Sequence, residues 1–124
     1  MMVSTKTRDR YETAKQAERE ARARYTAEVM QYRYYAEWGQ ITDAEFERQA
    51  KRIARETGLT AADKALREAE SAVLADLMVN AKRYGLPAED IETLKAHTGD
   101  HYRAGDYRAY RAYRARMLQI ALAH

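Results

Sequence analysis

Glycine divides this chain of 124 residues into helical segments. Four of its five glycines, Gly39, Gly58, Gly85 and Gly99, each follow a stretch rich in strong helix formers. A glycine in this place ends a helix by adopting a left-handed backbone, and the chain contains a single proline, Pro87. The spacing predicts helices over residues 6–37, 43–57, 61–84, 88–98 and 101–122, with 107 as an alternative start of the last one.

Capping signals support two of these boundaries. Thr42 is expected to be the N-cap of the second helix and Glu45 its N3 residue, which together make a capping box. Ile41 and Phe46 supply the hydrophobic staple that accompanies such a box. By the same reasoning, Thr60 is expected to cap the third helix.

We therefore predict an all-α fold, a four- or five-helix bundle with a long N-terminal helix, in a single domain of residues 1–124. Leu, Ile, Val and Phe together number only 17, whereas Ala numbers 24 and Tyr 10. Charged residues make up 33% of the chain but nearly cancel, to a net charge of +3, so the composition is not that of a disordered protein. Residues 1–24 offer mainly Tyr11 and alanines among many charges, and are expected to project, to fray, or to pack narrowly on another helix or subunit.

Several classes of protein are excluded. No apolar run is long enough for a transmembrane helix and the first residues lack a secretory signal, so a cytoplasmic protein with no membrane role is expected. The absence of cysteine removes disulfides, thiol catalysis and cysteine zinc sites. No phosphate loop, metalloprotease or nucleophile-elbow motif occurs, so neither an enzyme nor a cofactor is expected. His97 and His101 have metal-ligand spacing, but Gly99 between them favours a surface turn.

The most unusual segment is Tyr102 to Arg116, which holds four Tyr-Arg-Ala triplets. Arginine pairs with phosphates and tyrosine stacks on unpaired bases, so one interpretation is a surface that binds DNA or RNA. The alternative is a packed face with its tyrosine hydroxyls at the surface and arginines in solvent, made of Tyr107, Tyr110, Tyr113, Met117 and Ile120.

The second half of the first helix repeats this mixture of arginine and aromatic residues. The positive excess of the chain lies at its two ends, with +2 in residues 1–38 and +3 in residues 100–124. If the first and last helices pack side by side, they would form one basic, tyrosine-rich face. Alternatively, Tyr25, Tyr32 and Trp38 belong to the core, and acids four residues away, as in Glu18 and Arg22, neutralise the arginines.

One segment resembles a known family. Gly39-Gln40-Ile41-Thr42-Asp43-Ala44-Glu45-Phe46-Glu47, followed by Lys51-Arg52-Ile53, is similar to the short C-terminal (SHOCT) segment found at the ends of many bacterial and phage proteins. That family has the pattern Gly-x-Ile-Thr, an acid, Glu-Phe and then a basic amphipathic helix. The resemblance implies a short helical pair and a role in oligomerisation or partner contacts.

The function expected first is that of a small interaction protein: an adaptor, inhibitor or accessory subunit, such as phages and mobile elements encode. It would bind a larger protein or its own copies through surfaces of tyrosine, tryptophan and arginine, residue types enriched at binding hot spots. The alternative is a nucleic-acid-binding accessory protein. Both hypotheses use the same candidate residues: Arg22, Arg24, Arg33, Tyr34, Trp38, Arg103, Tyr107, Arg108, Tyr110, Arg111, Tyr113 and Arg114.

Overall fold

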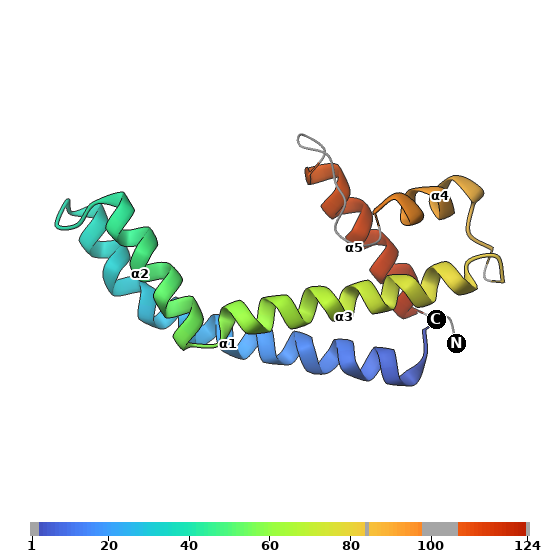
Figure 1. Cartoon of the computed structure of the whole chain (residues 1–124), viewed down its shortest axis with the longest axis horizontal. Helices are drawn as coiled ribbons and strands as arrows, with labels where there is room; N and C mark the ends of the chain where they lie inside the picture. Colours follow the sequence, from blue (N-terminus) through green and yellow to red (C-terminus); the bar gives the residue numbers. More distant parts are fainter. Residues whose placement is uncertain (1–2, 84, 98–106, 124) are drawn as a thin grey trace. The chain divides into compact units, whose positions relative to one another are not determined.

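The computed structural model describes residues 3–83, 85–97 and 107–123. In these ranges it contains no strand and five α-helices (Figure 1): α1 (Thr5–Glu37), α2 (Asp43–Glu56), α3 (Leu59–Asn80), α4 (Ala88–His97) and α5 (Tyr107–Ala123). The prediction of an all-α fold with a long N-terminal helix is confirmed. The described part of the last helix runs from Tyr107, and the earlier predicted start at residue 101 lies outside the described ranges, as does Gly99.

The turn between α1 and α2 follows the predicted chemistry. Gly39 has φ +70°, and the N–H of Gln40 donates to the carbonyl of Tyr35 at 2.8 Å, which is the long bond of a Schellman stop. Thr42 is the N-cap of α2, since its Oγ1 accepts from the N–H of Glu45 at 3.1 Å. The carboxylate of Glu45 bonds to side chains further along α2. A capping box has two hydrogen bonds, and the described contacts include the one that the Thr42 side chain accepts.

A junction of two residues, Thr57 and Gly58, separates α2 from α3. Gly58 has φ +82°; its N–H donates to the carbonyl of Arg55 at 3.2 Å and its carbonyl accepts from Ala62 at 2.9 Å. A Cβ at Gly58 would meet nothing within 4 Å, so the left-handed backbone, and not crowding, favours glycine here. The prediction that Thr60 caps α3 is wrong, because α3 begins at Leu59 and Thr60 already lies in its first turn.

The other end of α3 is less regular than expected. The helix ends at Asn80 and continues as a turn to residue 83, whereas the sequence predicted helix to 84. Gly85 has φ +76°, and the N–H of Leu86 donates to the carbonyl of Ala81 at 3.1 Å. The predicted glycine stop is therefore present, although the last turn before it is no longer α-helical.

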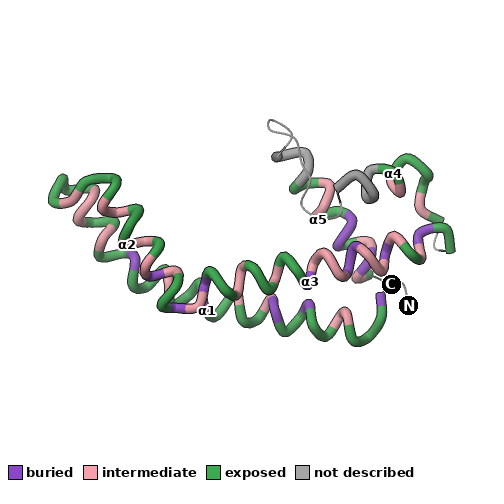
Figure 2. Tube along the Cα trace, in the orientation of Figure 1, coloured by how far each residue is buried: buried purple, intermediate pink, exposed green. Residues whose placement is uncertain are grey.

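The chain forms two compact units, of which residues 13–66 make up one. In this unit the C-terminal half of α1 and α2 lie side by side as a hairpin joined by residues 38–42 (Figure 1). Its buried aliphatic side chains include Val29 and Ile53, which are 2% and 1% exposed. Arg24 donates through Nη2 to the carbonyl of Thr57 at 3.1 Å, which ties α1 to the end of α2. Most other residues of the hairpin are exposed or half-buried (Figure 2), so its interior is thin.

Residues 1–12 and 67–124 make up the other unit. Ser4 N–H donates to Asp76 Oδ2 at 3.1 Å, and Arg8 Nη2 donates to the carbonyl of Leu122 at 2.9 Å. These bonds join the start of α1 to α3 and to the end of α5. The interior of this unit includes side chains from all three helices and from the segment before α1, among them Val3, Tyr11, Val73, Leu77, Met117 and Ala121.

Candidate interaction surfaces

Two of the predicted site residues on α1 are tied into the hairpin unit. Arg22 Nε donates to Glu18, and its Nη2 lies 3.4 Å from Asp63 Oδ1. The hydrogen bond to Glu18 raises the pKa of Arg22 above its usual value. Arg24 is bound to the carbonyl of Thr57. These guanidinium groups already hold partners, so they are the weaker candidates for contact with another molecule.

Arg33, Tyr34 and Trp38, by contrast, are exposed. Tyr34 is 51% exposed and Trp38 74% exposed, and Met30, one turn earlier, is 46% exposed. The N–H of Trp38 still donates to the carbonyl of Tyr34 at 3.0 Å, so the helical phase continues to Trp38. Met30, Tyr34 and Trp38 thus follow one another at steps of four residues on one face. We call these three residues the Trp38 stripe.

Smaller residues extend the Trp38 stripe toward the middle of α1. Ala23 and Ala27 are exposed on the same face, so apolar residues recur at 23, 27, 30 and 34, the spacing by which one helix packs on another. Glu20 and Glu37 lie at its two ends. The residues along its two long borders are basic or neutral: Arg19, Thr26 and Arg33 on one side, and Arg24 and Gln31 on the other.

The opposite face of α1 closes the hairpin. The ring of Tyr32 stands edge-on to that of Tyr35, with centroids 6.1 Å apart. The Tyr32 hydroxyl accepts from Arg52 Nη2 at 3.2 Å, and the guanidinium lies 5.9 Å from the ring centroid. The interpretation that placed Trp38 in the core with Tyr32 is wrong for Trp38, because its side chain is 74% exposed.

Two of the candidate residues on α5, Tyr113 and Arg114, bind inside their own unit. The side chain of Arg114 is only 11% exposed; its Nε donates to Glu70 Oε2 at 3.2 Å and its Nη2 to Ser71 Oγ at 3.1 Å. The Tyr113 hydroxyl donates to the carbonyl of Asp90 at 2.8 Å. These contacts bind α5 to α3 and α4. The other candidates here are Arg111, which is exposed; Tyr107, Arg108 and Tyr110, whose side chains are not described; and Arg103, outside the described ranges.

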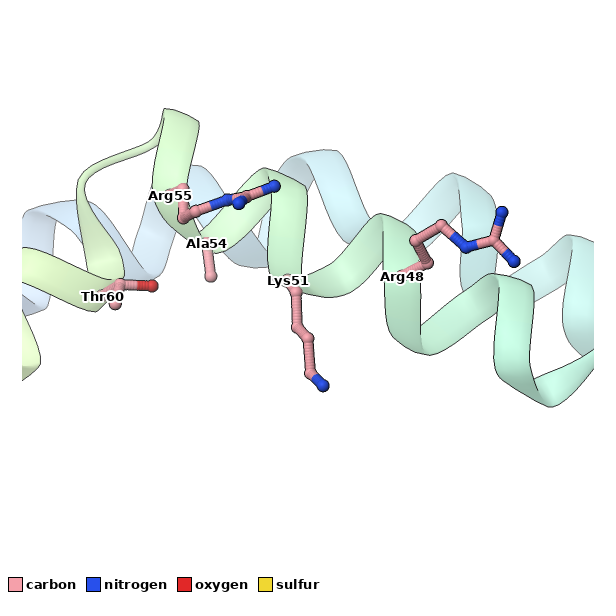
Figure 3. A pocket seen from close by; sticks show the side chains of 5 residues that line it. All are labelled: Arg48, Lys51, Ala54, Arg55 and Thr60. Carbon is pink, nitrogen blue, oxygen red and sulfur yellow. The ribbon is translucent and has the colours of Figure 1, made fainter.

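A second outward surface lies on α2. Arg48, Lys51 and Arg55 are exposed at positions i, i+3 and i+7, so they follow one side of the helix. With Ala54 and Thr60 they line a shallow hollow of about 370 Å³ (Figure 3). We call Arg48, Lys51 and Arg55 the basic row.

Met30 and the basic row were not among the residues predicted from the sequence. The signals were present: Met30 precedes Tyr34 and Trp38 at steps of four, and the cations of α2 recur at steps of three and four. Periodicity shows that residues share a face, but it does not show whether that face is covered. The exposure of these side chains supplies that information.

No known protein family, curated protein or solved structure matches the chain. Within the described ranges, no group of three or more His, Asp or Glu side chains is placed to hold a metal ion. The side chains of His97 and His101 are not among those described. None of the five helices, over its described residues, is long and apolar enough to cross a lipid bilayer.

Proposed function

We propose that this chain is a non-enzymatic interaction protein whose Trp38 stripe binds an amphipathic helix of a larger protein. One observation carries the proposal. The described residues expose four large apolar side chains, and three of them, Met30, Tyr34 and Trp38, lie on this one face. The fourth, Val79, is on α3. Single exposed apolar residues are common, whereas a row of them on one face is typical of a binding surface.

The residue types also favour a binding role. Trp, Tyr and Met are enriched in the centres of protein interfaces, and a tryptophan buries about 150–250 Å² when it is covered. Trp38 is 74% exposed, so it adds little packing energy to the fold. The same side chain can contribute that energy to a complex, because covering it removes its apolar area from water.

The borders of the Trp38 stripe indicate the chemistry of the partner. Arg19 and Arg33 are exposed and have no ion-pair partner among the described residues. A helix with acidic residues beside its apolar positions would complement these borders. A second copy of this chain complements them less well, because a twofold dimer joins a patch to itself and the residues that border the stripe between Glu20 and Glu37 are basic or neutral. We therefore assign the surface to a different protein.

The neighbouring sequence agrees with this assignment. Residues 39–53, which resemble the SHOCT segment, begin directly after Trp38. A role in partner contacts is what that resemblance implies. The residues that carry the resemblance include most of α2, one of the two helices of the hairpin that presents the stripe.

The proposal is tested by comparing two double variants as bait in extracts of the native host. Trp38→Ala with Tyr34→Ala removes the centre of the stripe, and Val79→Ala with Met78→Ala removes apolar area on α3. A protein captured by the wild type is then purified, and its affinity for each bait is measured by calorimetry. Loss of a hot-spot residue costs about 2 kcal/mol or more, so the stripe variant should bind at least about 30-fold more weakly. The α3 variant should bind like the wild type.

Equal loss in both variants, or no loss in the stripe variant, would contradict the proposal. Light scattering tests the remaining possibility, that the stripe binds a second copy of this chain. If the wild type is a dimer and Trp38→Ala is a monomer, the stripe is a self-association surface and the assignment to a different protein is wrong.

A further inference from the structure

The basic row on α2 is a second exposed surface, and it is separate from the apolar Trp38 stripe. Arg48 has a side chain that is 74% exposed and pairs with Glu45 at 3.1 Å. Lys51 and Arg55 are exposed and have no ion-pair partner among the described residues. An exposed pair such as that of Arg48 contributes about 0–1 kcal/mol, so it would exchange readily for a stronger anion.

The needs of the fold do not account for the whole row. A cation in the last turn of a helix interacts favourably with the helix dipole, and Arg55 occupies that place. The effect falls off within one turn, so it does not reach Arg48 and Lys51. Packing uses a different cation of α2: Arg52 binds Glu56 at 2.8 Å and also contacts Tyr32 of α1.

The geometry of the row fits an extended anion better than a small one. Figure 3 shows that Arg48, Lys51 and Arg55 do not converge on one point but are spread along the helix, with Lys51 pointing away from the two arginines. Seven residues of helix rise by about 10.5 Å between the first and the last. The hollow between them is shallow and includes the hydroxyl of Thr60. Such a surface suits a chain of repeated negative charges.

Two such chains are nucleic acid and an acidic protein, and the row favours the first. The outward side of α2 has no large apolar residue; beside the row it carries Ala44 and Glu47. An acidic protein would therefore gain only exposed ion pairs, which are weak. A nucleic acid gains affinity from cations alone, because each neutralised phosphate releases condensed counterions.

We propose that the basic row binds the phosphate backbone of nucleic acid without reading its sequence. Arg48 and Arg55 each present a guanidinium fork to one phosphate, Lys51 acts as a point charge, and the Thr60 hydroxyl donates a further hydrogen bond. The site lies apart from the Trp38 stripe and does not depend on the protein partner. The chain would then connect its partner to nucleic acid.

The test uses fluorescence anisotropy with a labelled 20-base-pair duplex of mixed sequence, titrated with the whole chain to about 100 μM, a range that covers typical non-specific affinities. Three phosphate contacts predict a slope of log K against log salt of about −2.7, or about 40-fold weaker binding at 200 mM than at 50 mM salt. The triple variant Arg48→Gln, Lys51→Gln, Arg55→Gln should lose measurable binding. The variant Arg48→Lys, Arg55→Lys should retain the slope, because it retains the charges.

A matched control removes three exposed charges elsewhere: Lys6→Gln, Lys64→Gln and Lys82→Gln. It should bind the duplex within about twofold of the wild type. Circular dichroism checks that every variant keeps its helices. Equal loss in the control and in the triple variant would show a general charge effect and overturn the proposal. So would the absence of duplex binding at 50 mM salt, or binding of polyglutamate in its place. None of these results depends on the protein partner, so failure here leaves the proposal for the Trp38 stripe standing.

Discussion

The two halves of α1 use the same residue spacing for opposite purposes. In the first half, Tyr11, Ala14 and Ala21 fall on one face and are 8%, 9% and 1% exposed. In the second half, apolar residues at 23, 27, 30 and 34 recur in the same alternation of threes and fours, and Met30 and Tyr34 remain about half exposed. Both patterns are those of a helix that packs on another.

The difference lies in the size of the side chains and in what covers them. Two of the three buried positions are alanines, which allow helices to approach closely but add little apolar area. The exposed positions include the larger side chains, which no described part of the chain covers. A spacing of threes and fours thus shows that a face is suited to packing. Only burial shows whether its partner is already present in the chain.

The largest expected effect comes from enlarging a covered alanine. Ala21→Leu adds three carbons to a side chain that is 1% exposed, and overpacking of this kind costs typically 1–3 kcal/mol. We expect a loss of about 3 kcal/mol in the free energy of unfolding, measured by urea denaturation. Ala27→Leu makes the same change on the exposed face and should alter stability by less than about 0.5 kcal/mol. If the two variants are equally stable, the first half of α1 is not packed as described.

A smaller effect is expected when a side chain is shortened, and we compare this change at two adjacent residues of α1. Val29 is 2% exposed and Met30 is 46% exposed. Val29→Ala removes two buried carbons, and after the better helix propensity of alanine is included we expect a loss of about 1–2 kcal/mol. Met30→Ala should stay within about 0.5 kcal/mol of the wild type by the same thermal or urea measurement. A larger loss for Met30→Ala would mean that its face is covered within the chain.

The smallest effect concerns pH and the buried tyrosine of α1, Tyr11. Burial, and then the nearby charges of Glu70 and Glu12, raise the pKa of Tyr11 above its ordinary value of 10.0. Above pH 10 the unfolded phenol loses its proton before the folded one, so the folded state binds more protons. The stability that Tyr11 contributes is therefore complete below pH 10 and falls as the pH rises through the folded pKa.

Tyr11→Phe should remove this part of the alkaline decline in the free energy of unfolding. The comparison is the slope of stability against pH between about 9.5 and 11. Identical slopes for Tyr11→Phe and the wild type would contradict the burial of Tyr11.

Local chemistry made the fold predictable. Gly39 and Gly58 end helices where the sequence placed them, and Thr42 caps α2, because each of these features depends on a few adjacent residues. Thr60 failed as a cap for a related reason: Gly58 allows the next helix to begin at once, and sequence alone does not show how short a junction is.

The surfaces were less predictable than the helices. Arg33, Tyr34 and Trp38 were among the candidates from their residue types, and they are exposed. Arg114 was a candidate for the same reason, but it is bound to Glu70 from a helix more than forty residues earlier. Which arginine finds an acid within the chain depends on tertiary packing, and periodicity along one helix does not contain that information.

The two-residue junction of Thr57 and Gly58 between α2 and α3 also sets the rotation of α3 about its own axis. An α-helix turns by about 100° for each residue, so one residue inserted after Gly58 would rotate every later side chain of α3 about its axis by that angle. The turn of residues 38–42 tolerates a change in length, because a loop can lengthen without rotating the helix that follows it. In natural variants of this chain, changes in length should therefore accumulate between α1 and α2 and be absent between α2 and α3.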